Sequence, residues 1–159
     1  MAIPAYYSLI RRGSSGPDVA LVQTWLNGIR DSCSWHAALT VDGKFGANAE
    51  KAVREFQLRY GLKEDGIVGA NSWNVRFARY TAIHGRIVPY PGIVLRSGSA
   101  GGCVRLVQQK LNADGERLTP DGKFGASTVA AVKRYQTRHG LTSDGSVGKD
   151  TWEKMFPAA

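Results

Sequence analysis

The chain has little of what a disulfide framework, a membrane span or a secretion signal requires. Only two of its 159 residues are cysteines, Cys33 and Cys103, and they do not match each other in the internal repeat described below. A repeated disulfide or metal framework is therefore excluded, and we interpret both as buried thiols. No stretch approaches the roughly 20 apolar residues of a membrane span, and residues 1–13 lack the basic start and apolar run of a signal peptide. We therefore expect a soluble chain whose export would need another route or a segment missing from this sequence.

Acidic residues are scarce relative to basic ones. The chain holds 13 Asp and Glu against 21 Lys and Arg, which gives a formal net charge of +8. The excess is spread over both halves of the sequence and is not gathered in a tail. This charge favours anionic partners, such as carboxylate-bearing glycans, phosphate polymers or nucleic acid.

One unit is written twice in this chain. The sequence Asp-Gly-Lys-Phe-Gly occurs at residues 42–46 and again at 121–125, and a second corner, Asp-Gly-x-Val-Gly, occurs at 65–69 and 144–148. Asp-Gly is turn chemistry, because Asp can bond its own backbone and Gly can adopt a positive φ. Internal repetition outweighs chain length as a guide to the number of domains. We therefore predict a first unit at residues 1–80, a linker at 81–91 and a second unit at 92–159.

Between the corners, apolar residues recur at helical spacing. We expect Ser15 to cap the first helix, with Pro17 in its first turn and Asp18 closing a capping box and favouring the helix dipole. The strongest helical pattern follows each Asp-Gly-Lys-Phe-Gly corner, and a third helix carries Trp73 in one unit and Trp152 in the other. The pattern predicts a mainly α chain made of two small three-helix units. Their glycine-cornered loops pair at most a few β residues.

The order of the motifs is specific to one family. Each unit reads Arg-x-Gly-Ser, Val-x-x-Val-Gln-x-x-Leu-Asn, Asp-Gly-Lys-Phe-Gly, Ala-Val-x-x-Phe/Tyr-Gln, Gly-Leu-x-x-Asp-Gly-x-Val-Gly and Ser/Thr-Trp. This series resembles the peptidoglycan-binding domain of the type 1 family, a three-helix module commonly appended to bacterial and phage cell-wall hydrolases. The resemblance covers both units and leaves out mainly the linker and the two ends; the first unit departs from it in a longer loop at residues 33–39. It implies non-catalytic targeting to peptidoglycan, with action at the cell wall or outside the cell.

Most aromatic residues stand at repeated amphipathic positions. A domain of this size buries about 60 to 65% of its unfolded surface, so nearly all of its apolar side chains are needed in the core. We assign core packing and no ligand role to Phe45, Phe56, Trp73, Phe124, Tyr135 and Trp152. Trp25 and Trp35 have no aromatic counterpart in the second unit. They either pack between the units or within the loop, or they stack on a sugar.

Two sets of repeated polar residues also need a role. Four glutamines interrupt apolar faces, and we interpret them as buried amides that satisfy backbone groups in the corners; they are Gln23, Gln57, Gln108 and Gln136. The repeated cations are either solvated charges or a surface for stem-peptide carboxylates, muramyl carboxylates or wall phosphates. We place this binding hypothesis on the rim between the first corner and the second helix. The candidate ligand-binding residues are Lys44, Arg59, Lys123, Arg138, Arg11, Arg96 and Trp35.

The residues offer little support for catalysis by this chain. Cys33 and His36 have partial zinc-ligand spacing, but no second pair lies near and the other unit lacks the motif, so we predict no metal and no cofactor. A wall hydrolase is the first alternative to a binding module. Against it, the corner aspartates have a sufficient structural role and little apolar material remains for a cleft.

A basic nucleic-acid-binding protein is the second alternative. It requires a recognition helix dense in Lys and Arg, yet the helix after the first corner mixes charges of both signs in one copy and is basic only in the other. The sequence therefore predicts a tandem module that binds peptidoglycan or an associated anionic wall polymer, without a membrane partner. Two weak sites on one chain gain avidity on a repetitive polymer, and the module directs a wall hydrolase or a related protein to it.

Overall fold

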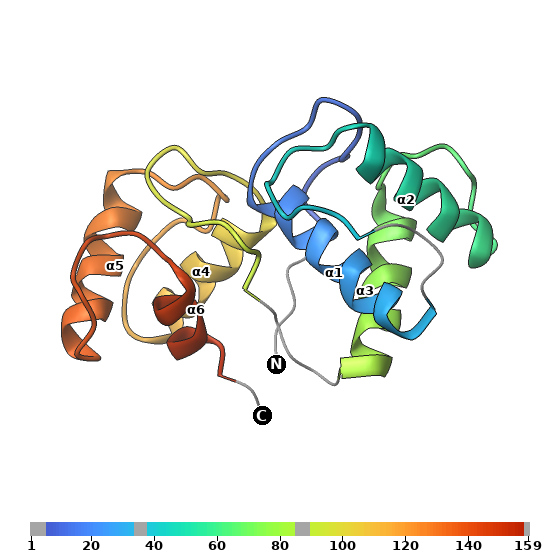
Figure 1. Ribbon diagram of the computed structural model, residues 1–159. Helices are drawn as coiled ribbons and strands as arrows, with labels where there is room; N and C mark the ends of the chain where they lie inside the picture. The colour runs from blue at the N-terminus through green and yellow to red at the C-terminus, as the bar shows by residue number, and fades with distance from the viewer. Residues whose placement is uncertain (1–5, 34–37, 85–89, 158–159) are drawn as a thin grey trace.

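The computed structural model describes residues 6–33, 38–84 and 90–157, which form six helices. The first unit contains α1 (Pro17–Cys33), α2 (Ala47–Arg59) and α3 (Ala70–His84), and the second contains α4 (Gly102–Ala113), α5 (Ala126–Arg138) and α6 (Lys149–Met155). Figure 1 shows the two groups of three helices side by side. The prediction of a mainly α chain built from two three-helix units is confirmed.

The segments between the helices pair only at isolated positions. Four single β-bridges occur within the described residues: Ile10 with Val68, Ser15 with Lys44, Leu95 with Val147 and Ala100 with Lys123. The last two repeat the first two at matching places in the second unit. Helix α3 continues to residue 84, so residues 81–84 of the expected linker are helical, while residues 85–89 lie outside the described part. The unit boundaries themselves remain a prediction.

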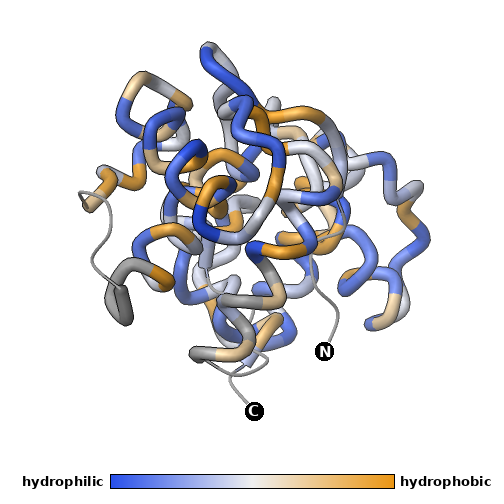
Figure 2. The backbone as a smooth tube through the Cα atoms, turned by 90° about the vertical axis from the view of Figure 1, so that its right-hand side faces the viewer, coloured by the Kyte–Doolittle hydropathy of each residue, from blue (hydrophilic) through white to orange (hydrophobic). Residues whose placement is uncertain are grey.

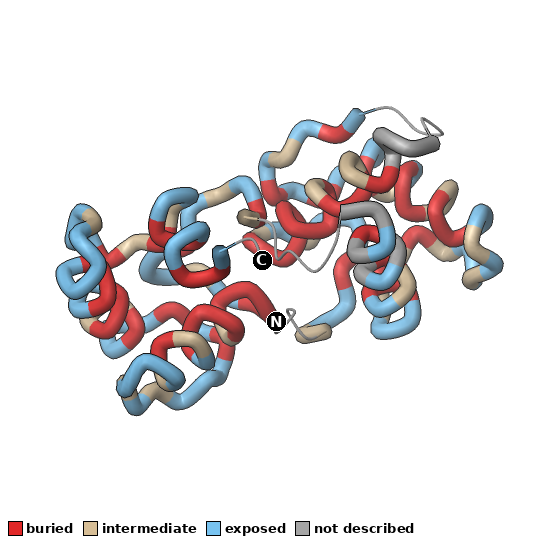
Figure 3. The backbone as a smooth tube through the Cα atoms, turned by 90° about the horizontal axis from the view of Figure 1, so that it is seen from below, coloured by how far each residue is buried: buried red, intermediate tan, exposed pale blue. Residues whose placement is uncertain are grey.

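Each unit buries its own aromatic side chains. Trp73 and Trp152 are 2% and 1% exposed, and the other repeated aromatics assigned to the core are buried as well. Trp25 is fully buried and meets Trp73 edge to face, with ring centroids 4.9 Å apart. Figure 3 shows buried residues along the inward faces of the helices in both units, and Figure 2 shows hydrophilic stretches on the outer loops. The repeated aromatic residues therefore belong to the core, as the small size of each unit predicts.

Buried glutamine amides hold the four corners. At the first corner, Gln23 Nε2 donates to the Asp42 carboxylate and to the Lys44 carbonyl, both at 3.0 Å, and its Oε1 accepts from the Gly43 N–H at 2.9 Å. The same set of contacts recurs at the other corners, from Gln57, Gln108 and Gln136. The interpretation of the repeated glutamines as buried amides is confirmed.

Each corner aspartate is held in its charged form. Asp42 Oδ1 accepts from the Lys44 N–H at 2.9 Å, which closes a turn around Gly43, whose φ is 72°. This backbone bond, followed by the bond from Gln23, holds the pKa of Asp42 below its ordinary value. The matching backbone bonds are the largest cause of the lowered pKa at the other corners, in Asp65, Asp121 and Asp144. The sequence prediction of Asp-Gly turns is confirmed.

The start of α1 differs from the expected cap. The helix begins at Pro17, and the Gly16 carbonyl accepts its first helical bond from the Ala20 N–H at 3.1 Å. Ser15 instead pairs with Lys44 as an isolated β-bridge. The prediction of Ser15 as the cap was wrong, because the backbone at this position is drawn into pairing with the first corner and the next residue precedes the helix.

The prediction that Asp18 closes a capping box in its own helix was also wrong. Its carboxylate accepts the N–H of Gly102 at 2.7 Å and the N–H of Cys103 at 2.9 Å, both at the start of α4 in the second unit. Asp18 is 8% exposed. Helix α4 begins after Gly101 and has no capping side chain of its own, so the distant carboxylate satisfies its free N–H groups. A partner this far along the chain leaves no local pattern.

In each unit, the segment before the first helix, called the leading segment below, packs against the first corner of the other unit. Tyr7 lies on Gly122, where an added Cβ would be 2.6 Å from the tyrosine ring, and its hydroxyl donates to a carbonyl of the same corner at 3.3 Å. Arg105 stands 4.8 Å from the centre of that ring. In the opposite direction, Ile93 approaches Gly43, where a Cβ would be 3.1 Å from its Cδ1. The glycine of each corner thus permits close contact between the units.

Candidate functional site

One group of the predicted cations lies where each leading segment meets the first corner. The Gly13 N–H donates to the Phe45 carbonyl at 3.0 Å, so the backbone near Arg11 runs beside the corner that carries Lys44. Both cations are exposed. The second unit repeats this arrangement with Arg96 and Lys123, which are exposed as well.

The other group lies at the far end of the second helix of each unit. Arg59 is in the last turn of α2 and Arg138 in the last turn of α5, and both are exposed. Each helix begins directly after the first corner and runs for 13 residues, about 20 Å. The structure therefore separates these arginines from the corner lysines, and the cations form two groups in each unit.

Sequence reasoning did not single out the acidic partner of the helix-end group in the second unit. Glu116 accepts two hydrogen bonds from Arg134, at 2.9 and 2.7 Å, and lies 3.6 Å from Arg138. The bonds from Arg134 hold the pKa of Glu116 below its ordinary value. A hollow of about 370 Å³ beside this pair is lined by Lys133, Arg134, Thr137 and Arg138. The two hydrogen bonds to Glu116 fix the guanidinium of Arg134. Lys133, Arg134 and Arg138 together form a cationic face on α5.

The first unit lacks this arrangement. At the positions that correspond to Lys133, Arg134 and Thr137, it carries Arg54, Glu55 and Leu58. The last of these is 68% exposed. The two units therefore present different surfaces at the ends of α2 and α5, although their cores are alike.

The two tryptophans without a counterpart have different outcomes. Trp25 is fully buried and packs edge to face on Trp73 of its own unit, so its face is not available to stack on a sugar. Lys110, which stands opposite it in the second unit, lies 3.5 Å from Asp114. Trp35 lies outside the described residues, as does His36 of the partial zinc motif.

The chemistry available to the described residues is limited. They contain no group of three or more His, Cys, Asp or Glu that could hold a metal ion. Cys103 is buried and unpaired, as expected for that thiol, while the side chain of Cys33 is outside the described set. In the same part of the chain, no helix is both long and apolar enough to cross a bilayer.

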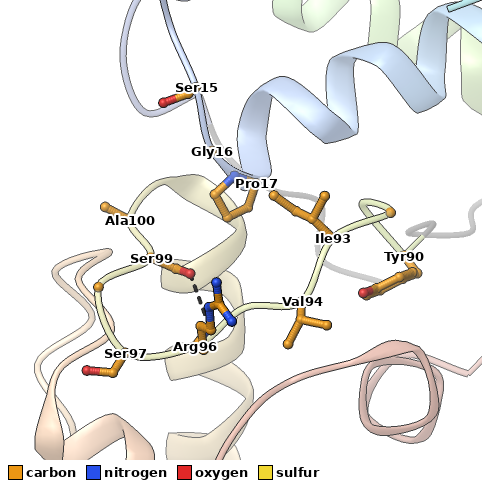
Figure 4. A pocket seen from close by; sticks show the side chains of 12 residues that line it. Ser15, Gly16, Pro17, Tyr90, Ile93, Val94, Arg96, Ser97, Ser99 and Ala100 are labelled. Atoms are coloured by element: carbon orange, nitrogen blue, oxygen red, sulfur yellow. Dashed lines mark hydrogen bonds between the residues drawn. The ribbon is translucent and has the colours of Figure 1, made fainter. Parts of the chain in front are cut away.

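A cleft between the units is the feature that sequence reasoning missed. It has a volume of about 800 Å³ and opens to solvent, with Ser15, Gly16 and Pro17 of the first unit on one side. Segments of the second unit form the other side, at residues 90, 92–94 and 96–100. Figure 4 shows the guanidinium of Arg96 between Ser99 and Val94 and directed toward Pro17. Of the predicted site residues that the structure describes, only Arg96 lines the cleft.

Only the relative placement of the units creates this cleft. Its walls come from the start of α1 with the two residues before it and from the segment before α4, and Asp18 binds the start of α4 close to them. The usable signal in the sequence was the absence of a cap at Gly101 and Gly102, which indicated that α4 needed a partner from elsewhere.

Comparison with known families gives a match over most of the chain. The profile of a family described as a putative peptidoglycan binding domain matches residues 15–75 and residues 101–155. Each match covers one unit, from the segment before its first helix to its third helix. The resemblance inferred from the motifs is confirmed, in two tandem copies.

Curated relatives include enzymes that are longer than this chain. The N-acetylmuramoyl-L-alanine amidase CwlL of Bacillus licheniformis is 29% identical over 93% of this chain and 45% of its own length. The zinc D-Ala-D-Ala carboxypeptidase of Streptomyces albus G is 40% identical over 39% of this chain and 26% of its own. The chain spans less than half the length of either relative.

Among solved structures, the N-terminal domain of SleB is 32% identical, with a TM-score of 0.42. The match covers 48% of this chain and 97% of that domain. A Burkholderia AP3 phage endolysin is 40% identical over 40% of this chain and 24% of its own, with a TM-score of 0.39.

Proposed function

Because the chain belongs to the family of putative peptidoglycan binding domains and carries two copies in tandem, we propose that it is a non-catalytic module that attaches to the bacterial cell wall at two points. The observation that carries this proposal is the joining of two wall-binding units by side-chain contacts, Asp18 on α4 above all. Units held in one orientation meet a repetitive polymer together. The second binding event is then intramolecular, and two weak sites give a stronger attachment.

The exposed cations supply the anion-binding surfaces of this proposal. Guanidinium groups bind carboxylates and phosphates through charge-assisted and often bidentate hydrogen bonds. In the second unit Arg138 shares a face with Lys133, and in the first Arg59 takes the matching place. The corner cations Lys44 and Lys123 add charge nearer to the contact between the units. We propose peptidoglycan, or an anionic polymer associated with it, as the ligand.

The relatives favour a role beside a hydrolase. Two of them are named as an amidase and a carboxypeptidase, and the chain matches only part of each. We propose that this module brings such an enzyme, on the same chain or on a partner, to its polymer. An assay of wall turbidity separates this role from hydrolysis by the chain itself, because clearing requires bond cleavage and binding does not.

Co-sedimentation with purified sacculi, prepared with and without teichoic acid, tests the proposal. The chain is expected to sediment with the sacculi without clearing them, and the double variant Arg59→Ala/Arg138→Ala is expected to sediment less. Lys149→Ala is the matched control, because this exposed cation on α6 pairs with Glu153 outside both cationic groups. Absence of wild-type sedimentation, or retention on duplex DNA in its place, would refute wall binding.

A further inference from the structure

The cleft between the units has an unusual set of side chains. Among the described residues, its lining contains one cation, Arg96, and several hydroxyl groups, and it contains no Asp, Glu, Asn or Gln. The apolar part comes from Ile93, Val94 and Pro17, with the ring of Tyr90 at one end. Such a surface offers hydrogen-bond donors and aliphatic contact but no carboxylate or amide acceptor.

The composition of this lining discriminates between the parts of the wall polymer. The hydroxyl groups of this lining can donate to a ligand or accept from it, whereas its guanidinium only donates and favours an anionic group. A peptide that ends in a free carboxylate presents such a group together with small apolar side chains. The cleft therefore complements the free end of a peptide.

The single cation is free to take a ligand. Arg96 forms no ion pair with another described residue, and its backbone N–H is fixed by Ser99 Oγ at 3.0 Å. Val94 beside it is 47% exposed although it is apolar. A guanidinium next to an exposed aliphatic side chain suits a carboxylate with a small apolar group beside it.

We propose that this cleft binds the stem peptide of peptidoglycan through its free terminal carboxylate. Arg96 takes the carboxylate, and Ile93, Val94 and Pro17 contact the small side chains of the peptide. A cleft of about 800 Å³ lies within the range of about 300–1,000 Å³ typical of ligand sites. The assignment rests on the proposed function, which supplies the wall as the polymer that carries the peptide.

The site belongs to the tandem arrangement and to neither unit alone. One wall comes from the start of α1 and the other from the leading segment of the second unit. Asp18 holds these walls at their distance by binding the start of α4. A separated unit would present Arg96 on an open surface and would lose the contacts from Pro17.

Isothermal titration of the full chain with a synthetic stem pentapeptide tests the assignment. The peptide is used as the free acid and as its C-terminal amide, and the free acid is expected to bind about tenfold more tightly, because the amide removes the charge that meets Arg96. Arg96→Ala is expected to lose a similar factor.

Lys51→Ala is the control for the loss of one positive charge. Lys51 is an exposed cation on α2, and it does not line the cleft. This variant is expected to bind the free acid as the wild type does. Thermal unfolding of each variant shows that the fold is retained.

The results separate this proposal from the function it rests on. A wild-type chain that sediments with sacculi yet binds acid and amide equally, or that loses as much affinity in Lys51→Ala as in Arg96→Ala, would overturn the cleft assignment and leave wall binding in place. A chain that fails to sediment with sacculi but binds the free acid through Arg96 would refute wall attachment and retain the peptide site.

Discussion

Asp18 and Cys103 hold the same position in the two copies of the repeat, and the Asp18 carboxylate accepts the Cys103 N–H at 2.9 Å. The residue of one copy thus caps the helix of the other. A second bond, from the Gly102 N–H at 2.7 Å, completes the cap. Because the second copy has a thiol in place of the carboxylate, the cap operates in one direction only, and the contact between two similar units is asymmetric.

Replacement of Asp18 by Ala should lower the stability of the protein and weaken the contact between the two units. The change leaves two buried N–H groups of α4 without an acceptor, and we expect a loss of about 1–2 kcal/mol in the free energy of unfolding, measured with denaturant. Small-angle scattering should show a wider distribution of distances between the units.

The control for this change is Asp150→Ala. Asp150 is an exposed aspartate in the first turn of α6, so its removal is expected to cost about 0.5 kcal/mol or less. Equal effects of the two substitutions would show that Asp18 acts only through the dipole of its own helix.

The reactivity of the Cys103 thiol measures how often the contact between the units opens. Burial raises the pKa of its thiol well above the ordinary value, and the charge of Asp18 raises it further, so the thiol is protonated and shielded. With Cys33 replaced by Ser, we expect slow modification by a thiol reagent in the native protein. Asp18→Ala should increase the rate about 5- to 30-fold, because opening costs about 1–2 kcal/mol less. If Asp18→Ala leaves the rate of modification unchanged, the thiol becomes exposed by an opening that does not involve the contact between the units.

The repeat predicted the parts of the fold that depend on nearby residues. The corners and the buried amides follow from residues that lie within one unit, so the position of Gln23 before Asp42 was sufficient to predict its role. The two copies could also be compared with each other, so that each residue type shared by both marked a position of the common fold. Helices and core aromatics were therefore predictable without an alignment.

The contact between the units was not predictable from the same patterns. Asp18 resembles a first-turn residue of its own helix, and its true partners lie in the second unit. Tyr7 likewise sits in a segment without periodicity and lies on Gly122. Such contacts depend on the surfaces of two folded units, and the pattern of a single sequence does not reveal those surfaces. The cleft lined by Arg96 was missed for the same reason.

The corner aspartates predict loss of stability in acid. Hydrogen bonds from backbone and glutamine lower the pKa of Asp42 and Asp121 in the folded state. A lowered pKa contributes stability that is present above the unfolded value of 3.8 and is lost as the pH falls through the folded value. Unfolding by denaturant should therefore become easier below about pH 4.

Asparagine at these corners separates charge from turn geometry. Its side-chain oxygen can still accept the backbone bond, so Asp42→Asn/Asp121→Asn should keep the corners folded and give a flatter stability profile below pH 4. The matched Ala substitutions should lose stability at neutral pH as well. An acid profile identical in wild type and the Asn variant would place the titrating groups elsewhere.

Arg76 places a cationic side chain in the core of the first unit. It is 0% exposed, and its guanidinium nitrogens have no hydrogen-bond acceptor within the part of the chain that the structure describes. The ring of Phe56, 4.9 Å away, gives a cation–π contact. The second unit has Met155 at the corresponding position, also buried. Burial of an uncompensated charge costs more than this contact returns.

Arg76→Met should therefore stabilise the protein. The substitution copies the solution found in the second unit, and we expect a gain of about 1–3 kcal/mol at neutral pH in denaturant unfolding. Burial lowers the pKa of Arg76 from its ordinary value to about 9. Above this pH the unfolded chain binds more protons than the folded one, so the stability of the wild type rises with pH and the gain from methionine should shrink above about pH 9. Arg76→Ala is the control for volume, because it removes the charge but leaves a cavity. A loss of stability in Arg76→Met at neutral pH would show that the guanidinium is compensated in the native state.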